Sequence, residues 1–375
     1  MIKLLKIYYL NLRKLVLSFL SKFVKNAELS KIEIKNILVI RLDRLGDLVL
    51  TTGIFEMLRK LYPNAKIHAL INENLKDVLN NNPYVDETIG INPSLKGLLN
   101  LLIQNELKKY KFDLAIDCQA NYKLFPAIIC FLSKAKIRLG FPIFGKEAFY
   151  NLQCTSSTDN KHLIELNRDL VNTVSIDKLE TQSPPCIIAD PKAFDKIEKK
   201  LKDLGINSND KILCIHPGAT HQTQRWFPHR FADLAQRLFK EFDLKPILLV
   251  GKNEDMIAQE IIKESKIEIK ILNNLKLSEM ITLFRRSSLL VCNNSGPLHV
   301  AAAIGTKNVS TMGPTIESRF KPIGKNSLYI RKNLSCSPCT LVKCNHHSCM
   351  NLIKVENMYE KCVELLNPEL TNEDS

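Results

Sequence analysis

The sequence predicts an α/β protein made of two Rossmann-like domains, each with a parallel sheet covered by helices. Apolar, strand-like runs alternate with helical patterns from Asn36 to Met312, which is typical of parallel sheets buried on both faces. The alternation is interrupted at the polar stretch Thr181–Pro185, whose consecutive prolines indicate a linker. A chain of 375 residues, 45% of them hydrophobic, can bury two separate cores.

Residues 1–30 are predicted to form a basic amphipathic helix ahead of the first domain. Apolar residues such as Leu12, Val16 and Leu20 fall opposite Lys14 and Lys22 at helical spacing. Basic residues interrupt every apolar run, so no segment approaches the roughly 20 residues that span a bilayer, and no signal peptide is recognisable. We predict a helix lying on an anionic membrane surface. The alternative is a helix that packs on its own domain or on a partner.

The first domain is expected over residues 31–185. Its predicted strands are Ile37–Arg41, Ile67–Ile71, Glu87–Ile91, Leu114–Cys118 and Ile137–Gly140. Its predicted helices are Leu48–Leu61, Leu75–Asn80, Leu95–Lys109 and Tyr122–Leu132.

The second domain is expected over residues 186–350 and repeats the pattern. Its predicted strands are Lys211–His216, Pro246–Val250, Ile267–Leu272, Ser288–Cys292 and Asn308–Met312. Its predicted helices are Pro191–Leu204, Phe231–Phe242, Asp255–Lys263, Ser278–Arg285 and Leu298–Ile304. Residues 351–375 are expected to form a helix, Lys354–Leu366, that crosses back onto the first domain, followed by a polar tail. Ligands are expected at the carboxyl ends of the strands, in a cleft between the two sheets.

One stretch of the second domain predicts an anion site. The apolar run Leu289–Cys292 gives way to Asn-Asn-Ser-Gly-Pro and then to a short helix that ends at Gly305. Backbone N–H groups at Ser295 and Gly296 would point out of the helix start, where the helix dipole favours a phosphate. The alternative is an ordinary capped helix.

Two other stretches have the same strand, loop and helix order. Ile37–Arg41 leads through Leu-Asp-Arg-Leu-Gly to Asp47, and Ile212–Ile215 leads through His-Pro-Gly-Ala-Thr to Arg225 and a further helix. In this order and spacing the three stretches resemble glycosyltransferase family 9, the lipopolysaccharide core heptosyltransferases. The resemblance runs from about Asn36 to Met350, and it implies a GT-B fold and an inverting transfer of a nucleotide-activated sugar.

The resemblance also implies roles for individual residues. Asp47 matches the general base that removes the proton of the acceptor hydroxyl, whereas the competing carboxylate of Asp43 lies one turn too early. Arg225 matches a basic residue near the donor phosphates. With Thr220, Ser295 and Gly296 it would bind the leaving diphosphate, so we expect no metal ion and no cofactor in the transfer.

The donor sugar and the nucleoside would contact further residues of the second domain. His299 matches a histidine near the donor sugar, Leu277 matches a position near adenine, and Glu254 fits a carboxylate that binds ribose hydroxyls. The chain departs from the family at Asn294, where members commonly carry aspartate. Asn294 can still bond a sugar hydroxyl, but it leaves the identity of the donor sugar open.

Composition limits the partners. A formal net charge of +14 favours an anionic partner, and no nucleic-acid-binding motif accompanies the charge. Most of the eleven cysteines stand singly, several within apolar runs, which indicates a reducing, cytoplasmic location. Four lie close together with the spacing C-x2-C-x4-C-x4-C, for which a structural zinc site, disulfides and free thiols all stay open: Cys336, Cys339, Cys344 and Cys349.

These observations lead to one favoured function and two alternatives. The favoured function is transfer of heptose from ADP-heptose to the lipopolysaccharide inner core, an anionic lipid-linked saccharide, at the cytoplasmic membrane surface. The first alternative keeps the fold but uses another nucleotide sugar or another glycan acceptor. The second is a nucleotide- or lipid-binding module without catalytic activity.

Overall fold

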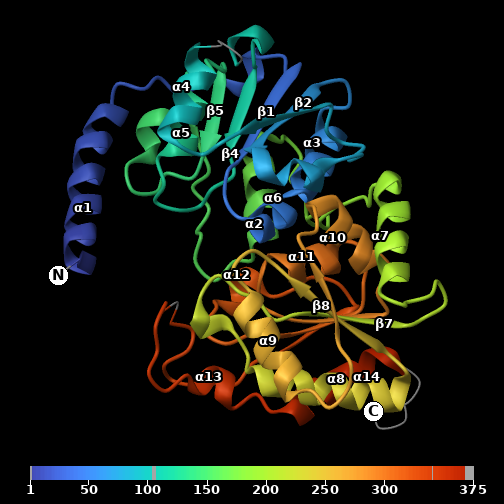
Figure 1. Cartoon of the computed structure of the whole chain (residues 1–375). Helices are drawn as coiled ribbons and strands as arrows, with labels where there is room; N and C mark the ends of the chain where they lie inside the picture. The colour runs from blue at the N-terminus through green and yellow to red at the C-terminus, as the bar shows by residue number, and fades with distance from the viewer. Residues whose placement is uncertain (1, 104–106, 340, 368–375) are drawn as a thin grey trace. The chain divides into compact units, whose positions relative to one another are not determined.

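The computed structural model describes residues 2–103, 107–339 and 341–367. The chain forms two compact units, Met1–Cys186 and Ile187–Ser375, and the division falls one residue after the expected linker end at Pro185 (Figure 1). Each unit is an α/β layer structure with one six-stranded parallel sheet. The predicted fold class is therefore confirmed.

The sheet of the first unit has the strand order β3-β2-β1-β4-β5-β6. Its centre is β1, which pairs with β2 on one side and β4 on the other, so the strand order reverses at the carboxyl end of β1. Ligands bind outside such reversal points in open α/β sheets. The strands are β1 (Asn36–Arg41), β2 (Lys66–Asn72), β3 (Glu87–Ile91), β4 (Leu114–Asp117), β5 (Ile137–Gly140) and β6 (Leu152–Gln153).

Helices cover both faces of this sheet. Helices α2, α3 and α6 pack together on one face, while α4 and α5 lie on the other (Figure 1). The α-helices are α1 (Ile2–Ser21), α2 (Leu45–Thr51), α3 (Gly53–Leu61), α4 (Leu95–Ile103), α5 (Phe125–Leu132) and α6 (Leu163–Val174). The 3₁₀ segments are η1 (Leu29–Lys31), η2 (Glu73–Leu79), η3 (Lys108–Tyr110) and η4 (Lys146–Phe149).

Helix α1 is attached to the first unit through η4 and the turn before it. The Arg13 guanidinium donates to the Phe144 carbonyl, and the Ser18 hydroxyl donates to the Glu147 carboxylate. Leu17 packs against Gly145, whose positive φ of 88° suits glycine. Because α1 touches the unit along this side, apolar side chains on its other sides, such as Leu15 and Phe19, stay exposed.

The sheet of the second unit has the order β12-β11-β10-β7-β8-β9. It reverses between β10 and β7, so the carboxyl ends of these two strands lie next to each other. The strands are β7 (Ile212–His216), β8 (Lys245–Val250), β9 (Lys270–Asn273), β10 (Leu289–Asn293), β11 (Asn308–Thr311) and β12 (Ser327–Ile330).

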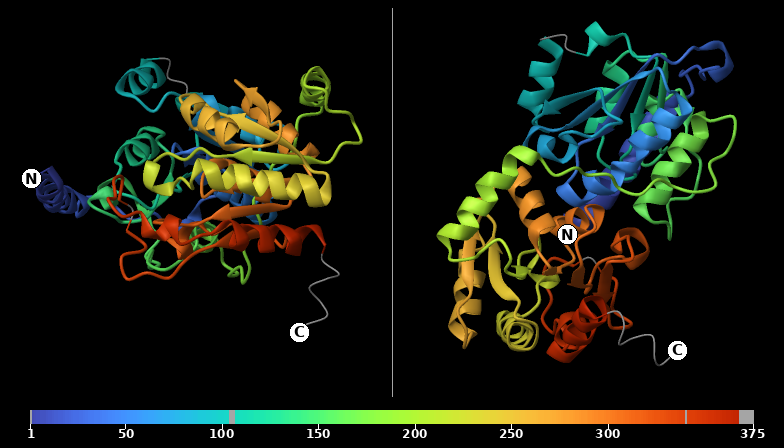
Figure 2. Two further views of the ribbon diagram at one scale, coloured as in Figure 1. Left: turned by 60° about the horizontal axis from the view of Figure 1, so that its bottom comes forward. Right: turned by 90° about the vertical axis from the view of Figure 1, so that its right-hand side faces the viewer.

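Helices α8, α9 and α14 pack on one face of this sheet, and α7, α10 and α11 pack together on the other (Figures 1 and 2). The helices are α7 (Pro191–Asp203), α8 (Pro228–Phe242), α9 (Asp255–Glu264), α10 (Leu277–Arg286), α11 (Gly296–Ala303), α12 (Glu317–Phe320), α13 (Ser348–Asn351) and α14 (Val355–Leu366), with a 3₁₀ turn η5 (Gln222–Gln224).

Several local expectations differ from the structure. Helix α14 does not cross to the first unit, because Met358, Cys362 and Leu365 are buried in the core of the second unit with residues of β10 and β11. The short edge strands β6 and β12 were not expected, since each is too short to give a clear alternating pattern. Residues 104–106 of the expected helix Leu95–Lys109 lie outside the described residues.

Candidate functional site

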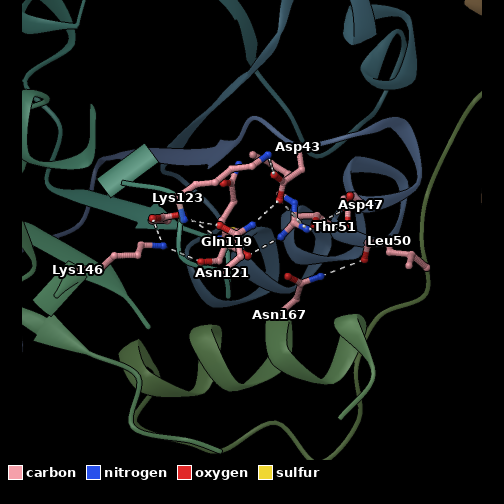
Figure 3. A network of polar contacts seen from close by, with 12 residues as sticks. Asp43, Asp47, Leu50, Thr51, Gln119, Asn121, Lys123, Lys146 and Asn167 are labelled. Carbon is pink, nitrogen blue, oxygen red and sulfur yellow. Dashed lines mark hydrogen bonds and ion pairs between the residues drawn. The ribbon is translucent and has the colours of Figure 1, made fainter. Parts of the chain in front are cut away.

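Asp47 lies in the first turn of α2, just beyond the carboxyl end of β1 (Figure 3). Its carboxylate is 22% exposed and forms an ion pair with Arg41 at 3.3 Å. The next turn is held by the Thr51 hydroxyl, which donates to the Asp47 carbonyl at 2.8 Å. The partly exposed carboxylate of Asp47 therefore follows β1, the strand at which the order of the sheet reverses.

Arg41, the last residue of β1, sits between two carboxylates. Its guanidinium is 3.4 Å from Asp43 and 3.3 Å from Asp47, and it is almost fully buried, as is Asp43. Asp43 has two further contacts, with Lys123 and Asn121, each at 3.3 Å (Figure 3). The Asp43 carboxylate is therefore bonded to three side chains of the unit, whereas the Asp47 side chain is partly exposed.

The loop after β4 fixes the position of the Arg41 side chain. The Cys118 carbonyl accepts from the Arg41 guanidinium, so the buried cation is tied to the neighbouring strand. Asp117, which precedes Cys118, forms a fully buried ion pair with Lys146 at 2.8 Å. The Lys146 ammonium also donates to the Gln119 carbonyl at 2.7 Å, and the Tyr150 hydroxyl donates to Asp117 at 2.5 Å. Each buried charge thus has a partner, as stability in a low-dielectric interior requires.

This environment acts on the acidity of Asp47. Burial raises the pKa of Asp47 above its ordinary value of 3.8, and the negative charge of Asp43 raises it further. The Arg41 guanidinium opposes both effects and lowers it. A raised pKa makes the ionised carboxylate a stronger proton acceptor, which suits removal of a proton from a hydroxyl group.

In the second unit, Ser295 caps the short helix α11 after β10. Ser295 has extended backbone angles, and its side chain makes no capping bond to the helix. Its hydroxyl oxygen is buried without a hydrogen-bond partner among the described residues. The first N–H groups of a helix also lack internal partners. Pro297 has no N–H, and the Leu298 N–H donates to the Ser295 carbonyl at 3.2 Å. The donors that this helix start could offer a phosphate are therefore the Ser295 hydroxyl and the backbone N–H groups of Ser295 and Gly296.

Asn293, one position before the predicted sugar-binding residue, is the residue that joins these loops. It is completely buried, and its side-chain oxygen accepts from the Trp226 N–H at 2.9 Å and from the Thr311 hydroxyl at 2.9 Å. Its amide nitrogen donates to the Pro217 carbonyl at 2.7 Å. Sequence reasoning did not single it out, although a polar residue ending an otherwise apolar strand was a usable signal.

The loop after β7 carries Arg225 and Thr220. Arg225 folds back so that two of its guanidinium nitrogens donate to the Ala219 carbonyl at 3.0 and 3.1 Å. Thr220 is exposed next to this bond. Since Asn293 ties Pro217 and Trp226 to the end of β10, this loop adjoins the start of α11.

Glu254 lies against the same loop. Its carboxylate accepts from the Gly251 N–H at 2.8 Å and lies 3.6 Å from the His216 ring. A Cβ atom at Gly218 would stand only 1.7 Å from this carboxylate, so a larger residue there would displace the Glu254 side chain. Burial lowers the pKa of His216, while Glu254 opposes that shift. His216, Arg225 and Glu254 therefore share one charged cluster, which the carboxyl ends of β7 and β8 position.

The remaining predicted residues take different places. His299 is buried in α11, one turn after Ser295. Asn294 is also buried, and its amide donates to the Phe320 carbonyl at 3.1 Å. Leu277 is half-buried at the first position of α10.

Residues 341–353, in the cysteine-rich part of the chain, contact the Arg225 loop. The Thr223 hydroxyl donates to the Leu341 carbonyl at 2.6 Å, and the His347 ring lies 2.8 Å from the Thr223 carbonyl. The Trp226 indole donates to the Ile353 carbonyl at 2.9 Å. All eleven cysteines are free, and no group of three metal-binding side chains occurs in the described part of the chain.

Comparison with known proteins bears on the identity of this chain. A family model described as glycosyltransferase family 9 (heptosyltransferase) matches residues 101–349, which is more than half of the chain. The chain belongs to glycosyltransferase family 9. It is therefore a glycosyltransferase, and the predicted family is confirmed.

Individual relatives of this family 9 protein agree. Lipooligosaccharide heptosyltransferase 2 of Campylobacter jejuni is 31% identical over 182 residues, 46% of this chain and 57% of that protein. Lipopolysaccharide heptosyltransferase 1 of Campylobacter coli is 26% identical over 305 residues, 76% of this chain and 86% of that protein. The solved structure of Escherichia coli ADP-heptose lps heptosyltransferase II shares the fold, with a TM-score of 0.74 and 18% identity over 89% of this chain and 99% of that one.

Proposed function

We propose that this family 9 glycosyltransferase transfers heptose from ADP-heptose to the lipopolysaccharide inner core, with inversion and without a metal ion. The observation that carries the proposal is the pair of helix starts at the ends of β1 and β10. One presents a partly exposed carboxylate, and the other presents a buried hydroxyl without a partner among the described residues, at a helix start suited to a diphosphate. The names of the relatives, two lipopolysaccharide or lipooligosaccharide heptosyltransferases and an ADP-heptose enzyme, support this donor and acceptor.

In the proposed mechanism Asp47 is the general base. It removes the proton from an acceptor hydroxyl while that oxygen attacks the anomeric carbon of the donor sugar. The bond between the anomeric carbon and the diphosphate breaks on the opposite side, which inverts the configuration. The raised pKa of Asp47 strengthens it as a proton acceptor.

The second unit would stabilise the departing ADP. Ser295 and Gly296 supply helix-terminal donors, and Thr220 and Arg225 supply a hydroxyl and a cation. In this role Arg225 would exchange its contact with the Ala219 carbonyl for the diphosphate. Glu254 would bind the ribose and Leu277 would pack near adenine, while His299 and Asn294 would contact the sugar.

Product analysis tests this proposal. The full-length chain is incubated with a lipid A–Kdo acceptor and ADP-heptose, and mass spectrometry detects the product. We expect the acceptor to gain one heptose with release of ADP, in the presence of EDTA, and NMR to show an inverted linkage. Transfer from another nucleotide sugar in preference to ADP-heptose would support the alternative that Asn294 leaves open. Binding of ADP without transfer from any donor would contradict enzymatic activity.

We also propose that α1 binds the anionic surface of the cytoplasmic membrane. Leu15, Phe19 and Phe23 are 71%, 59% and 72% exposed, and Lys14 and Lys22 line the same groove as Leu15 and Phe19. An exposed apolar stripe beside lysines suits acyl chains and anionic headgroups. No helix in the described residues is long and apolar enough to cross a bilayer.

Vesicle sedimentation tests the role of α1. We expect the chain to bind vesicles that contain phosphatidylglycerol, and Leu15→Ser with Phe19→Ser to weaken binding about 10-fold or more, because each lost side chain removes buried apolar area. Phe194→Ser is the matched control, since Phe194 is 50% exposed on the second unit. Equal binding to phosphatidylcholine vesicles, or equal losses for Phe194→Ser, would contradict the proposal.

A further inference from the structure

Two carboxylates of the first unit compete for one buried cation. The Arg41 guanidinium is 3.4 Å from Asp43 and 3.3 Å from Asp47, and its own position is fixed by the Cys118 carbonyl. Asp43 and Asp47 are the ion-pair partners of Arg41 among the described residues, and its Nε atom has no partner there. The negative charge of Asp43 offsets part of the Arg41 charge and so reduces the electrostatic stabilisation that Arg41 provides to the Asp47 carboxylate.

The two carboxylates differ in accessibility. Asp43 is 7% exposed and bonds to Asn121 and Lys123 as well as to Arg41. Asp47 is 22% exposed and shares only Arg41 as an ion-pair partner among the described residues. A substrate hydroxyl could therefore approach Asp47 more readily than Asp43.

We propose that Arg41 and Asp43 form a positioning pair that aims Asp47 and keeps it a strong proton acceptor. Arg41 orients the Asp47 carboxylate through their ion pair. The negative charge of Asp43 offsets part of the Arg41 charge, so Asp47 keeps its affinity for a proton. When Asp47 takes up a proton from the acceptor, Arg41 keeps Asp43 as its counter-ion, and no buried charge is left unpaired. This inference rests on the proposed role of Asp47 as general base.

Other groups near Asp47 are exposed or neutral. Arg44, at the start of α2, lowers the pKa of Asp47 through its charge and its backbone N–H, but it is exposed. Lys123 reaches Asp43 at 3.3 Å, and it is 55% exposed. Helix α6, which packs on α2, contributes the neutral Asn167, whose amide donates to the Leu50 carbonyl. Arg41 and Asp43 are thus the buried charges that face Asp47.

The test is the pH dependence of kcat/KM in full-length variants. Wild-type activity should rise with pH along an acid limb that lies above 3.8, because Asp47 must be ionised. Asp43→Asn removes a like charge and frees Arg41 for Asp47, so the acid limb should move down by about one pH unit, with lower activity at the plateau. Arg41→Gln removes the opposite charge, so the limb should move up by a similar amount. Arg41→Lys should restore most of that shift.

A matched control separates tuning from loss of structure. Asp113 is also 7% exposed and paired with a lysine, Lys136, at 2.7 Å, but it lies at the other end of β4 and bonds to Lys35 and Asn36. Asp113→Asn should leave the acid limb unchanged even if it lowers stability. An acid limb that stays fixed in both Asp43→Asn and Arg41→Gln, in folded protein, would overturn the inference.

A second measurement keeps the inference separate from the proposed function. NMR titration of ¹³C-labelled aspartate, assigned by loss of the signal in Asp47→Asn, follows the Asp47 carboxyl without turnover. The pKa of Asp47 should fall in Asp43→Asn and rise in Arg41→Gln. If those shifts appear while Asp47→Asn retains full turnover, the coupling stands and the proposed role of Asp47 fails. If Asp47→Asn is inactive but the shifts are absent, the result supports Asp47 as general base and contradicts the positioning role of Arg41 and Asp43.

Discussion

Asp47 in the first unit and Ser295 in the second both follow a buried parallel strand and begin a helix, yet they are held in different ways. The surroundings of Asp47 are buried charges that pair with one another: Arg41 with two carboxylates, and Lys146 with Asp117. Ser295 has a buried hydroxyl without a described partner, and Arg225 bonds to a backbone carbonyl.

This difference matches the two chemical tasks that we propose. A general base must be held at one orientation and one acidity, so its neighbours are fixed and paired. A site for a leaving anion needs donors that are positioned but unoccupied until the anion binds. We therefore expect substitutions in the first unit to change stability or kcat, and those in the second unit to change donor affinity.

The largest expected change in stability follows from breaking the buried pair of the first unit. Lys146→Met should lower the free energy of unfolding by about 3 to 5 kcal/mol, because Asp117 would remain buried without its cation. Urea denaturation followed by far-UV circular dichroism measures this loss. The control Lys136→Met removes a 61% exposed cation and should cost about 1 kcal/mol or less. Equal losses would show that burial of the pair is unimportant.

A smaller effect is expected from the cation of the second unit. Arg225→Ala should weaken ADP binding about 10- to 100-fold, because a charged hydrogen-bond donor to the diphosphate is lost. Titration calorimetry with ADP measures the affinity. Arg237→Ala, which removes an exposed arginine paired with Glu241 and Glu356 on the same unit, should bind ADP normally. Normal ADP affinity in Arg225→Ala would remove this residue from the donor site.

The smallest expected effect is at the helix start. Ser295→Ala should weaken ADP binding about 3- to 10-fold and leave the unfolding free energy nearly unchanged, since its hydroxyl has no described partner to lose. Ser287→Ala should do the opposite, because the Ser287 hydroxyl donates to the Leu283 carbonyl, away from the site. Thermal unfolding with and without ADP distinguishes the two. A large loss of stability in Ser295→Ala would mean that its hydroxyl is structural.

The local part of this arrangement could be predicted from the sequence. Asp47 and Ser295 each follow a buried strand within a few residues, so a change from apolar to polar residues was enough to place them at helix starts. The alternation of strands and helices gave both sheets for the same reason. Family resemblance added the roles of Arg225 and His299, which local pattern alone did not provide.

The contacts that support the site could not be predicted, because the sheet order creates them. Lys146 and Asp117 are far apart in sequence and meet only because β5 lies beside β4. The contacts of Asn293 could not be predicted, since Trp226, Pro217 and Thr311 come together only when β10 lies between β7 and β11. The packing of α14 on its own unit likewise depends on long-range burial that periodicity does not encode.

Replacing Asp47 tests the central claim most directly. Asp47→Asn keeps the shape of the side chain but removes its capacity to accept a proton, and both turnover with ADP-heptose and calorimetric ADP affinity are measured on the same preparation. The account predicts that kcat falls about 10²- to 10⁴-fold while the dissociation constant for ADP stays within about twofold of wild type. Turnover at the wild-type rate, or loss of ADP binding in parallel with loss of turnover, would contradict it.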